Sequence, residues 1–71
     1  MRYLVIVEKG QAGFGAYVPD LPGCVAAASS RKEVVRLIRE AIELHLEDLR
    51  ERGESVRPPT STVEVVDVAA A

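Results

Sequence analysis

A short loop of sequence VPDLPGC, residues 18–24, constrains this chain more than any other feature. Pro19 and Pro22 each fix φ, remove a backbone donor and bias the residue before them toward extended geometry. Pro22 and Gly23 suit the middle of a type II turn, because glycine readily adopts the positive φ that this turn needs at its third position. Leu21 is then an apolar side chain on a stiff connection, where we expect core packing or a partner to cover it. The loop holds no pair of reactive side chains, which favours a role in shape or recognition.

The length of the chain predicts one domain, residues 1–71, with a thin core. At this size folding buries only about 60% of the surface of the unfolded chain, and oligomers are a common remedy. The chain has two tyrosines, one phenylalanine and no tryptophan, so the core must be built mainly from Val, Leu, Ile and Ala. We therefore expect a homo-oligomer, either a dimer or a tetramer.

The charge and the single cysteine indicate which partners and compartments suit the chain. The net charge is −2, so a surface that neutralises phosphates is not favoured and no direct nucleic-acid binding is expected. A mildly acidic surface suits a basic protein partner. One cysteine cannot form an internal disulfide, which fits a reducing cytoplasm. No apolar run approaches the roughly 20 residues that span a bilayer, and the N-terminus lacks the features of a signal peptide. We expect a cytoplasmic protein without membrane contact.

The N-terminal residues 2–8 alternate in the manner of a β-strand. The alternate side chains form two sets, with Tyr3, Val5 and Val7 on one face and Leu4 and Ile6 on the other. Because both faces are apolar, we expect a helix to cover one of them and a second subunit the other.

Three further segments are interpreted as strands. Residues 14–18 follow a glycine-bounded turn and form a hairpin with the first strand. Residues 24–28 are short and small-sided, and we interpret them as a third strand. Residues 62–68 alternate again after an extended connector that holds Pro58-Pro59, and they predict a final edge strand.

A long helix is predicted between Ser30 and Gly53. Ser30 and Glu33 match a capping box, in which each side chain satisfies a free backbone donor of the other residue. Gly53 fits the position just past the helix end, where positive φ is wanted. Apolar residues at three- and four-residue spacing form one stripe along it: Val34, Ile38, Ala41, Ile42, His45 and Leu49. The predicted fold class is α+β, in the order β-β-β-α-β, with the helix on one face of an antiparallel meander and a strand order of 3-2-1-4.

No catalytic, metal-binding or cofactor-binding residue is predicted. Cys24 and His45 are the only cysteine and histidine, and nothing in their spacing places them within hydrogen-bond reach of each other. They also cannot supply a four-ligand structural zinc site. The acids along the helix predict a solvated face, with Arg36 and Glu40 as one of its ion pairs. Gly10 and Gly13 are not followed by a helix, so their segment predicts a hairpin turn and not a phosphate cradle. A further alternative is an enzyme that uses Cys24 and His45.

These features together resemble the HicB-like antitoxin family over roughly residues 2 to 60. The most specific element is the run Pro19-Asp20-Leu21-Pro22-Gly23-Cys24, and the capped helix with Glu40-Ala41-Ile42 supports it. The family usually carries Gly, Asp and Thr ahead of the helix, where this chain has Ala28, Ser29 and Ser30. These changes retain helix capping and alter the loop surface.

The resemblance implies a reduced ribonuclease H-like fold without nuclease activity. It also implies a non-catalytic module of a type II toxin–antitoxin system, which occludes a small basic mRNA-cleaving toxin of the HicA type. Many members add a C-terminal DNA-binding domain, and because this sequence ends at Ala71 we expect none here. Asp20, Leu21, Pro22 and Gly23 are the candidate residues, as a partner-binding or a structural loop. The alternative is a stand-alone homo-oligomer of the same fold with an unknown ligand or partner.

Overall fold

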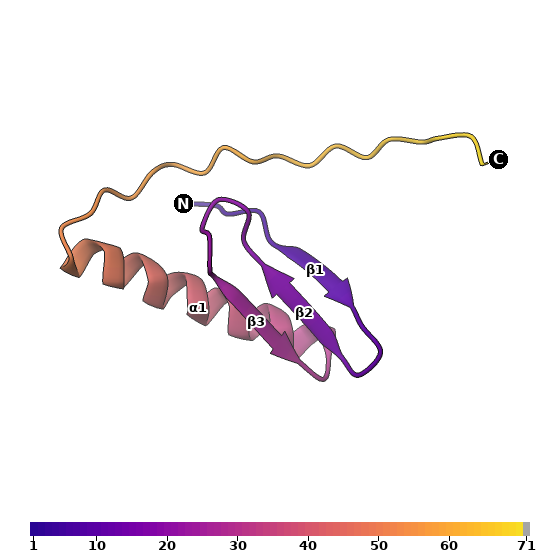
Figure 1. The fold of residues 1–71 in the computed structure, drawn as a ribbon, viewed down its shortest axis with the longest axis horizontal. Coiled ribbons are helices and arrows are strands. Elements are labelled where there is room, and N and C mark those ends of the chain that lie inside the picture. The colour runs from indigo at the N-terminus through magenta and orange to yellow at the C-terminus, as the bar shows by residue number, and fades with distance from the viewer. Residues whose placement is uncertain (71) are drawn as a thin grey trace.

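A computed structural model describes residues 1–70 as a three-stranded antiparallel sheet followed by one long helix (Figure 1). The strands are β1 (Ile6–Lys9), β2 (Phe14–Tyr17) and β3 (Val25–Ala28), and their order in the sheet is β1-β2-β3. The helix α1 spans Arg31–Glu51. The predicted α+β class, the meander and the single long helix are confirmed. Within residues 1–70 no helix has both the length and the apolarity needed to cross a membrane.

The first strand is shorter than predicted, because β2 leaves the sheet early. The ladder between β1 and β2 runs from Lys9 opposite Phe14 to Ile6 opposite Tyr17. At Val18 the backbone amide instead donates to the carbonyl of Cys24, at 3.2 Å, where the proline-rich loop begins to close. Residues 2–5 are therefore left without a ladder partner, although they continue the line of β1.

The two faces of the sheet differ in what covers them. Figure 1 shows α1 crossing behind the strands, so that one face packs on the helix and the other stays open. Of the two apolar faces predicted for the first strand, the one that carries Tyr3, Val5 and Val7 packs against the core. The core itself consists of six buried residues from the strands, the loop and the helix: Ala16, Val18, Leu21, Cys24, Val34 and Ile38. All six are small or aliphatic, in agreement with the expectation of a thin core.

Both ends of α1 form where the sequence predicts them. Ser30 is the N-cap, and its Oγ accepts a hydrogen bond from the backbone amide of Glu33 at 3.2 Å. The second hydrogen bond of the capping box, from the Ser30 amide to the Glu33 carboxylate, is replaced, because this carboxylate accepts hydrogen bonds from the Arg36 guanidinium. At the other end Gly53 has φ +72°, and the amide of Glu54 donates to the carbonyl of Leu49 at 2.9 Å. This is the Schellman arrangement, which satisfies carbonyls that the helix leaves free.

The predicted final strand, residues 62–68, is not part of the sheet that residues 1–70 form. The segment is extended and runs away from the strands toward the C-terminal end of Figure 1. Its four valines are exposed, and Val65 retains 84% of its accessible surface. Within residues 1–70 the sheet therefore has the 3-2-1 part of the predicted order, and residues 62–68 do not pair with β1 as a fourth strand.

Candidate protein-binding surfaces

The proline-rich loop closes through three backbone hydrogen bonds. The amide of Leu21 donates to the carbonyl of Val18 at 3.1 Å, and the amide of Cys24 donates to the carbonyl of Leu21 at 3.0 Å. The second bond encloses Pro22 and Gly23, and Gly23 has φ +86°. This geometry fits the type II turn that the sequence predicts. The two prolines and one glycine thus produce a rigid reversal between β2 and β3.

Asp20 fastens this loop to a distant part of the chain. Its carboxylate accepts from the backbone amide of Ser61 at 3.1 Å, from the Ser61 hydroxyl at 3.0 Å and from the Thr60 hydroxyl at 3.3 Å. The backbone amide of Ser61 is the main cause of a lowered pKa at Asp20; partial burial opposes this effect, and the two hydroxyls add to it. Hydrogen bonds to the ionised carboxylate favour that form. Asp20 therefore fixes the point from which residues 62–70 depart.

The four candidate residues of the loop lie in different surroundings. Leu21 is buried in the core, with 6% of its surface exposed, and Asp20 is half-buried beneath Ser61. Pro22 and Gly23 are exposed at the tip of the turn. Only this tip is open to another molecule. Sequence reasoning missed Thr60 and Ser61 as the partners of Asp20, because no local pattern links residues 40 or 41 positions apart.

Cys24 and His45 take up separate positions. The Cys24 thiol is part of the buried core, and burial raises its pKa. His45 is half-buried on α1. Across residues 1–70 no hydrogen bond joins the two side chains, and no three His, Cys, Asp or Glu residues gather as metal ligands. A thiol with a raised pKa holds little thiolate at neutral pH, which disfavours nucleophilic chemistry.

The open face of the sheet carries an apolar row. The ladder places Ile6 beside Tyr17, and Tyr17 beside Val25, so one side chain from each strand lies in line. Tyr17 and Val25 are exposed and Ile6 is half-buried. We call these three residues the open-face row. Its two-residue period is visible within each strand, but its alignment across strands depends on the register.

A second apolar surface lies where the N-terminal residues pass over α1. A cleft of about 540 Å³ opens there, and its apolar lining includes Tyr3, Val5, Val35, Ile42 and Leu46. Arginine and glutamate side chains also line it. We call it the N-terminal cleft. It adjoins β1, which is an edge strand of the sheet.

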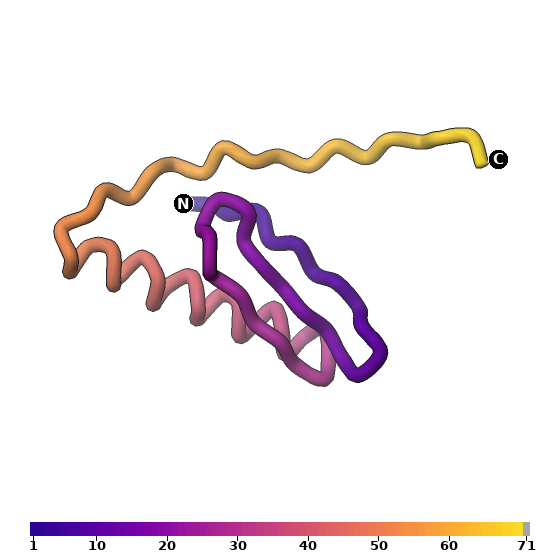
Figure 2. Tube along the Cα trace, viewed as in Figure 1, coloured from indigo at the N-terminus to yellow at the C-terminus, as the bar shows by residue number. Residues whose placement is uncertain are grey.

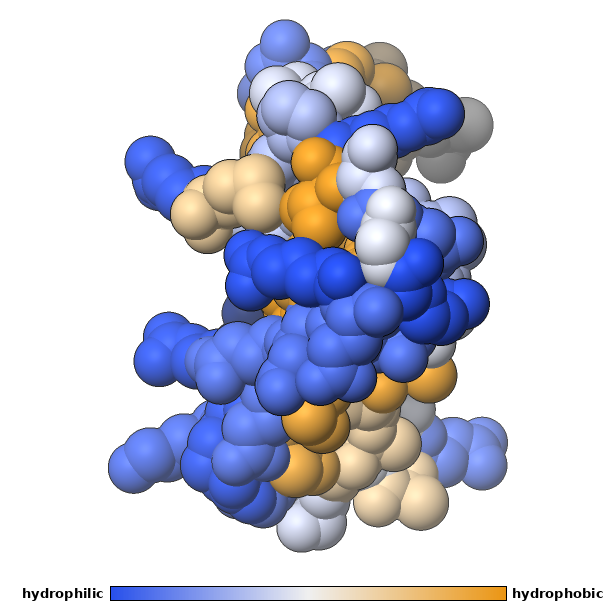
Figure 3. Space-filling model, turned by 90° about the vertical axis from the view of Figure 1, so that its left-hand side faces the viewer, coloured by the Kyte–Doolittle hydropathy of each residue, from blue (hydrophilic) through white to orange (hydrophobic). Residues whose placement is uncertain are grey.

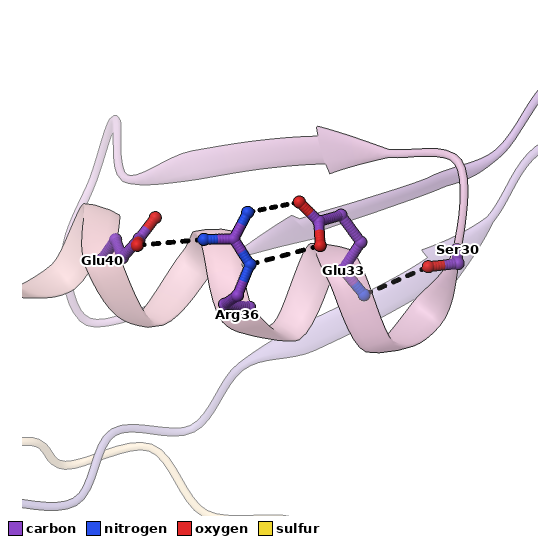
Figure 4. A network of polar contacts seen from close by, with 4 residues as sticks. All are labelled: Ser30, Glu33, Arg36 and Glu40. Carbon is purple, nitrogen blue, oxygen red and sulfur yellow. Dashed lines mark hydrogen bonds and ion pairs between the residues drawn. The ribbon is translucent and has the colours of Figure 1, made fainter.

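The solvent side of α1 is charged and paired. Arg36 bridges Glu33 and Glu40, with 3.0 Å between its Nη1 and the Glu40 carboxylate (Figure 4). The pairing with Glu33 lowers the pKa of that carboxyl and raises the pKa of Arg36. From the end where α1 finishes, hydrophilic side chains cover most of the molecule, with apolar patches exposed between them (Figure 3). The predicted Arg36–Glu40 pair is confirmed.

Comparison with known proteins places this chain in one family. The family described as HicB-like antitoxin of bacterial toxin–antitoxin systems matches residues 3–70. A UPF0150 protein of Thermoplasma acidophilum is 35% identical over 71 residues, which cover 99% of this chain and 100% of that protein. A UPF0150 protein of Helicobacter pylori is 50% identical over 44 residues, or 62% of this chain and 61% of the relative.

A third relative, a UPF0150 protein of Archaeoglobus fulgidus, is 42% identical over 48 residues, which cover 66% of this chain and 70% of the relative. No solved structure matches the chain significantly. The family match extends over the whole sheet, the loop, the helix and the C-terminal segment to residue 70, so this chain belongs to the HicB-like antitoxin family.

Proposed function

We propose that this protein is the non-catalytic antitoxin of a type II toxin–antitoxin pair, and that it occludes a small basic mRNA-cleaving toxin of the HicA type. The observation that carries the proposal is the family match over residues 3–70. The acidic balance of the chain, with a net charge of −2, suits a basic protein partner. The protein works in the cytoplasm, where such a toxin meets its RNA, and needs no cofactor.

The toxin docks on the open-face row. Ile6, Tyr17 and Val25 form an apolar strip on the sheet face that α1 leaves uncovered. Aromatic side chains are enriched at protein interfaces, and an exposed row of this kind marks a surface suited to a partner. Occlusion requires only that the bound antitoxin covers the toxin's RNA-binding surface, so no reactive group on this chain takes part.

The proline-rich loop serves this function as a scaffold. Leu21 fills the core and Asp20 fastens Thr60 and Ser61, so two of the four candidate residues have partners within the chain. Pro22 and Gly23 set the reversal that brings β3 beside β2 and thereby aligns Val25 with Tyr17. The loop thus shapes the open-face row without contacting the toxin.

Coexpression with the small protein encoded beside this one tests the function. We expect a complex that copurifies and that relieves the growth arrest caused by the neighbour alone. Val25→Asp should abolish copurification because it places a charge in the apolar row, whereas Leu44→Asp, at an exposed site on α1, should leave the complex intact. Failure to copurify with any neighbour would favour the stand-alone homo-oligomer instead.

A fourth strand and the reduced ribonuclease H-like arrangement belong to the same proposal. Residues 62–68 would have to lie beside β1, which is the free edge next to the N-terminal cleft. The strand order would then become 3-2-1-4, whichever chain supplies the fourth strand.

A further inference from the structure

We infer that residues 62–68 of one copy pair with the β1 edge of a second copy, so that two chains exchange C-terminal strands. We call residues 62–68 the C-terminal arm. The inference goes beyond the proposed function, because it concerns a second copy of this chain and the β1 edge, to which the open-face row contributes only Ile6.

The arm has the sequence and the conformation of a strand but no partner in its own chain. It is extended, and none of its residues belongs to the sheet formed within residues 1–70. Val63 and Val65 share one face, while Val66 and Val68 share the other. These four side chains retain between 65% and 84% of their accessible surface. A run of β-branched residues exposed in this way is a template for pairing with another strand.

The same chain has a free edge that fits the arm. β1 borders the sheet, and residues 2–5 continue its line without a ladder partner on β2. Tyr3 and Val5 line the N-terminal cleft between this edge and α1. A strand added beside β1 would place one valine pair of the arm toward that cleft and the other pair beside Leu4 and Ile6. A single added strand would thus pair the free backbone N–H and C=O groups of the β1 edge and cover both apolar surfaces.

The shape of the chain favours a second copy over folding back onto the same sheet. The Cα radius of gyration is 14.4 Å, whereas a compact domain of this length has about 11 Å. The chain exposes 5796 Å², about 1,500 Å² more than a folded monomer of 7.7 kDa exposes. A stable interface needs only about 800 Å² from each partner. The excess surface is therefore large enough for an interface between two copies.

The direction of the arm agrees with this reading. Asp20 holds Thr60 and Ser61 beside the loop, so the arm starts from a fixed point. The Cα trace in Figure 2 then diverges from the β1–β2 hairpin until the C-terminal end stands clear of it. Both copies carry the same arm and the same edge. In a two-fold arrangement each copy therefore donates its arm to the partner's β1 and receives the partner's arm at its own β1, so the assembly closes at two chains.

Two measurements on the full chain test the exchange. Light scattering coupled to size exclusion should give twice the mass of one chain, and amide hydrogen exchange should show protection at residues 2–7 along the β1 edge. Val65→Pro removes a ladder donor from the arm without adding charge. It should halve the mass and remove the protection. Because residues 62–70 make no core contact, its helix signal in circular dichroism should stay that of the unaltered chain.

Val25→Asp is the matched control, because it alters an exposed valine of the open face, and it should leave the dimer intact. A monomer with protected residues 2–7 would mean that the arm folds back on its own sheet. A monomer without this protection would mean that the arm pairs with a different protein. A dimer that resists Val65→Pro, or that Val25→Asp dissociates, would place the interface elsewhere. Each of these four results overturns the exchange, whereas copurification with a toxin bears only on the proposed function.

Discussion

At the scale of single residues, Asp20 links two segments that are distant in sequence. Its carboxylate receives three hydrogen bonds from Thr60 and Ser61, and their combined effect lowers its pKa. Such bonds favour the ionised side chain and also decide where the C-terminal arm begins. A single carboxylate therefore contributes both to stability and to the path of the chain.

Asp20 should make the stability of the protein depend on pH in acid. Since its pKa in the folded state is lowered from the ordinary value of 3.8, its contribution is complete above that value and is lost as the pH falls through the folded pKa. Asp20→Asn should therefore lower the melting temperature at pH 7 and have progressively less effect toward pH 2. Thermal melts across this range measure the difference. Glu47→Gln, at an exposed helix site, is the control, and an Asp20→Asn effect that is constant with pH would contradict the assignment.

Gly13 is a second residue whose role follows from its surroundings. A Cβ added at this position would lie 2.5 Å from the carbonyl oxygen of Ala28, which is backbone and cannot easily move. Gly13→Ala should destabilise the fold by about 1–3 kcal/mol, as other overpacked sites do. Gly10→Ala is the matched control in the same turn, because its nearest contact would be 3.6 Å away. Urea unfolding of the two variants measures the difference, and equal midpoints would refute the close approach.

At the scale of elements, α1 is defined by its two ends and by one buried stripe. Ser30 begins it and Gly53 follows its end, while Val34 and Ile38 are almost completely buried against the sheet. The charged face beyond this stripe is paired along the helix, and such exposed pairs add only a few tenths of a kcal/mol each. The stability of the helix therefore depends mostly on its caps and on packing.

The N-cap of α1 can be tested by removing one hydroxyl. Ser30→Ala loses the hydrogen bond that the Glu33 amide donates, so it should cost about 1 kcal/mol of unfolding free energy. Ser29→Ala, one residue earlier and also exposed, should change the stability little. Chemical denaturation followed by circular dichroism compares the two. A larger loss for the Ser29 variant would show that the helix begins elsewhere.

The buried stripe of α1 gives a sharper contrast between two aliphatic side chains. Ile38 retains 2% of its surface and Leu44 retains 67%. Ile38→Ala should cost about 2–5 kcal/mol because it leaves a cavity in a core of six residues. Leu44→Ala should stay within about 0.5 kcal/mol of the unaltered protein. Equilibrium unfolding decides the matter, and similar losses at both sites would mean that another molecule buries Leu44.

At the scale of the whole molecule, the surface left exposed by one chain matters more than any single contact. The small core, the open-face row and the C-terminal arm leave this chain with more exposed surface than a compact monomer of its mass has. Two partners divide these surfaces in our proposals, with a toxin on the open face and a second copy at the β1 edge. The two surfaces meet at Ile6 on β1, whereas Tyr17 and Val25 of the open-face row lie on β2 and β3, away from that edge.

The exchanged dimer should make thermal stability depend on protein concentration. Because association stabilises only the folded chains, a tenfold rise in concentration adds about 1.4 kcal/mol per dimer and should raise the melting temperature by about 3–5 °C. Scanning calorimetry at several concentrations measures this shift. The Val65→Pro variant should melt at one temperature throughout the series. A concentration-independent transition in the unaltered chain would contradict the dimer.

Elements with local causes could be predicted from the order of the amino acids. Pro22 and Gly23 predict the turn, Ser30 and Gly53 predict the bounds of the helix, and alternation predicts that Tyr3, Val5 and Val7 share one face. In each of these cases the residues that specify the structure are close together in the chain. The resemblance to the HicB-like family rested on the same local runs and is confirmed by the family match.

Features that depend on contacts between distant residues became visible only in the folded chain. In the fold β1 begins only at Ile6, because β2 leaves the ladder at Val18. The fold also joins Asp20 to Ser61. It also left residues 62–68 outside the sheet, although their alternation is that of a strand. Periodicity states that a segment can pair, but not with which edge or in which chain, because a strand obtains its hydrogen bonds from a neighbour that its own sequence does not specify.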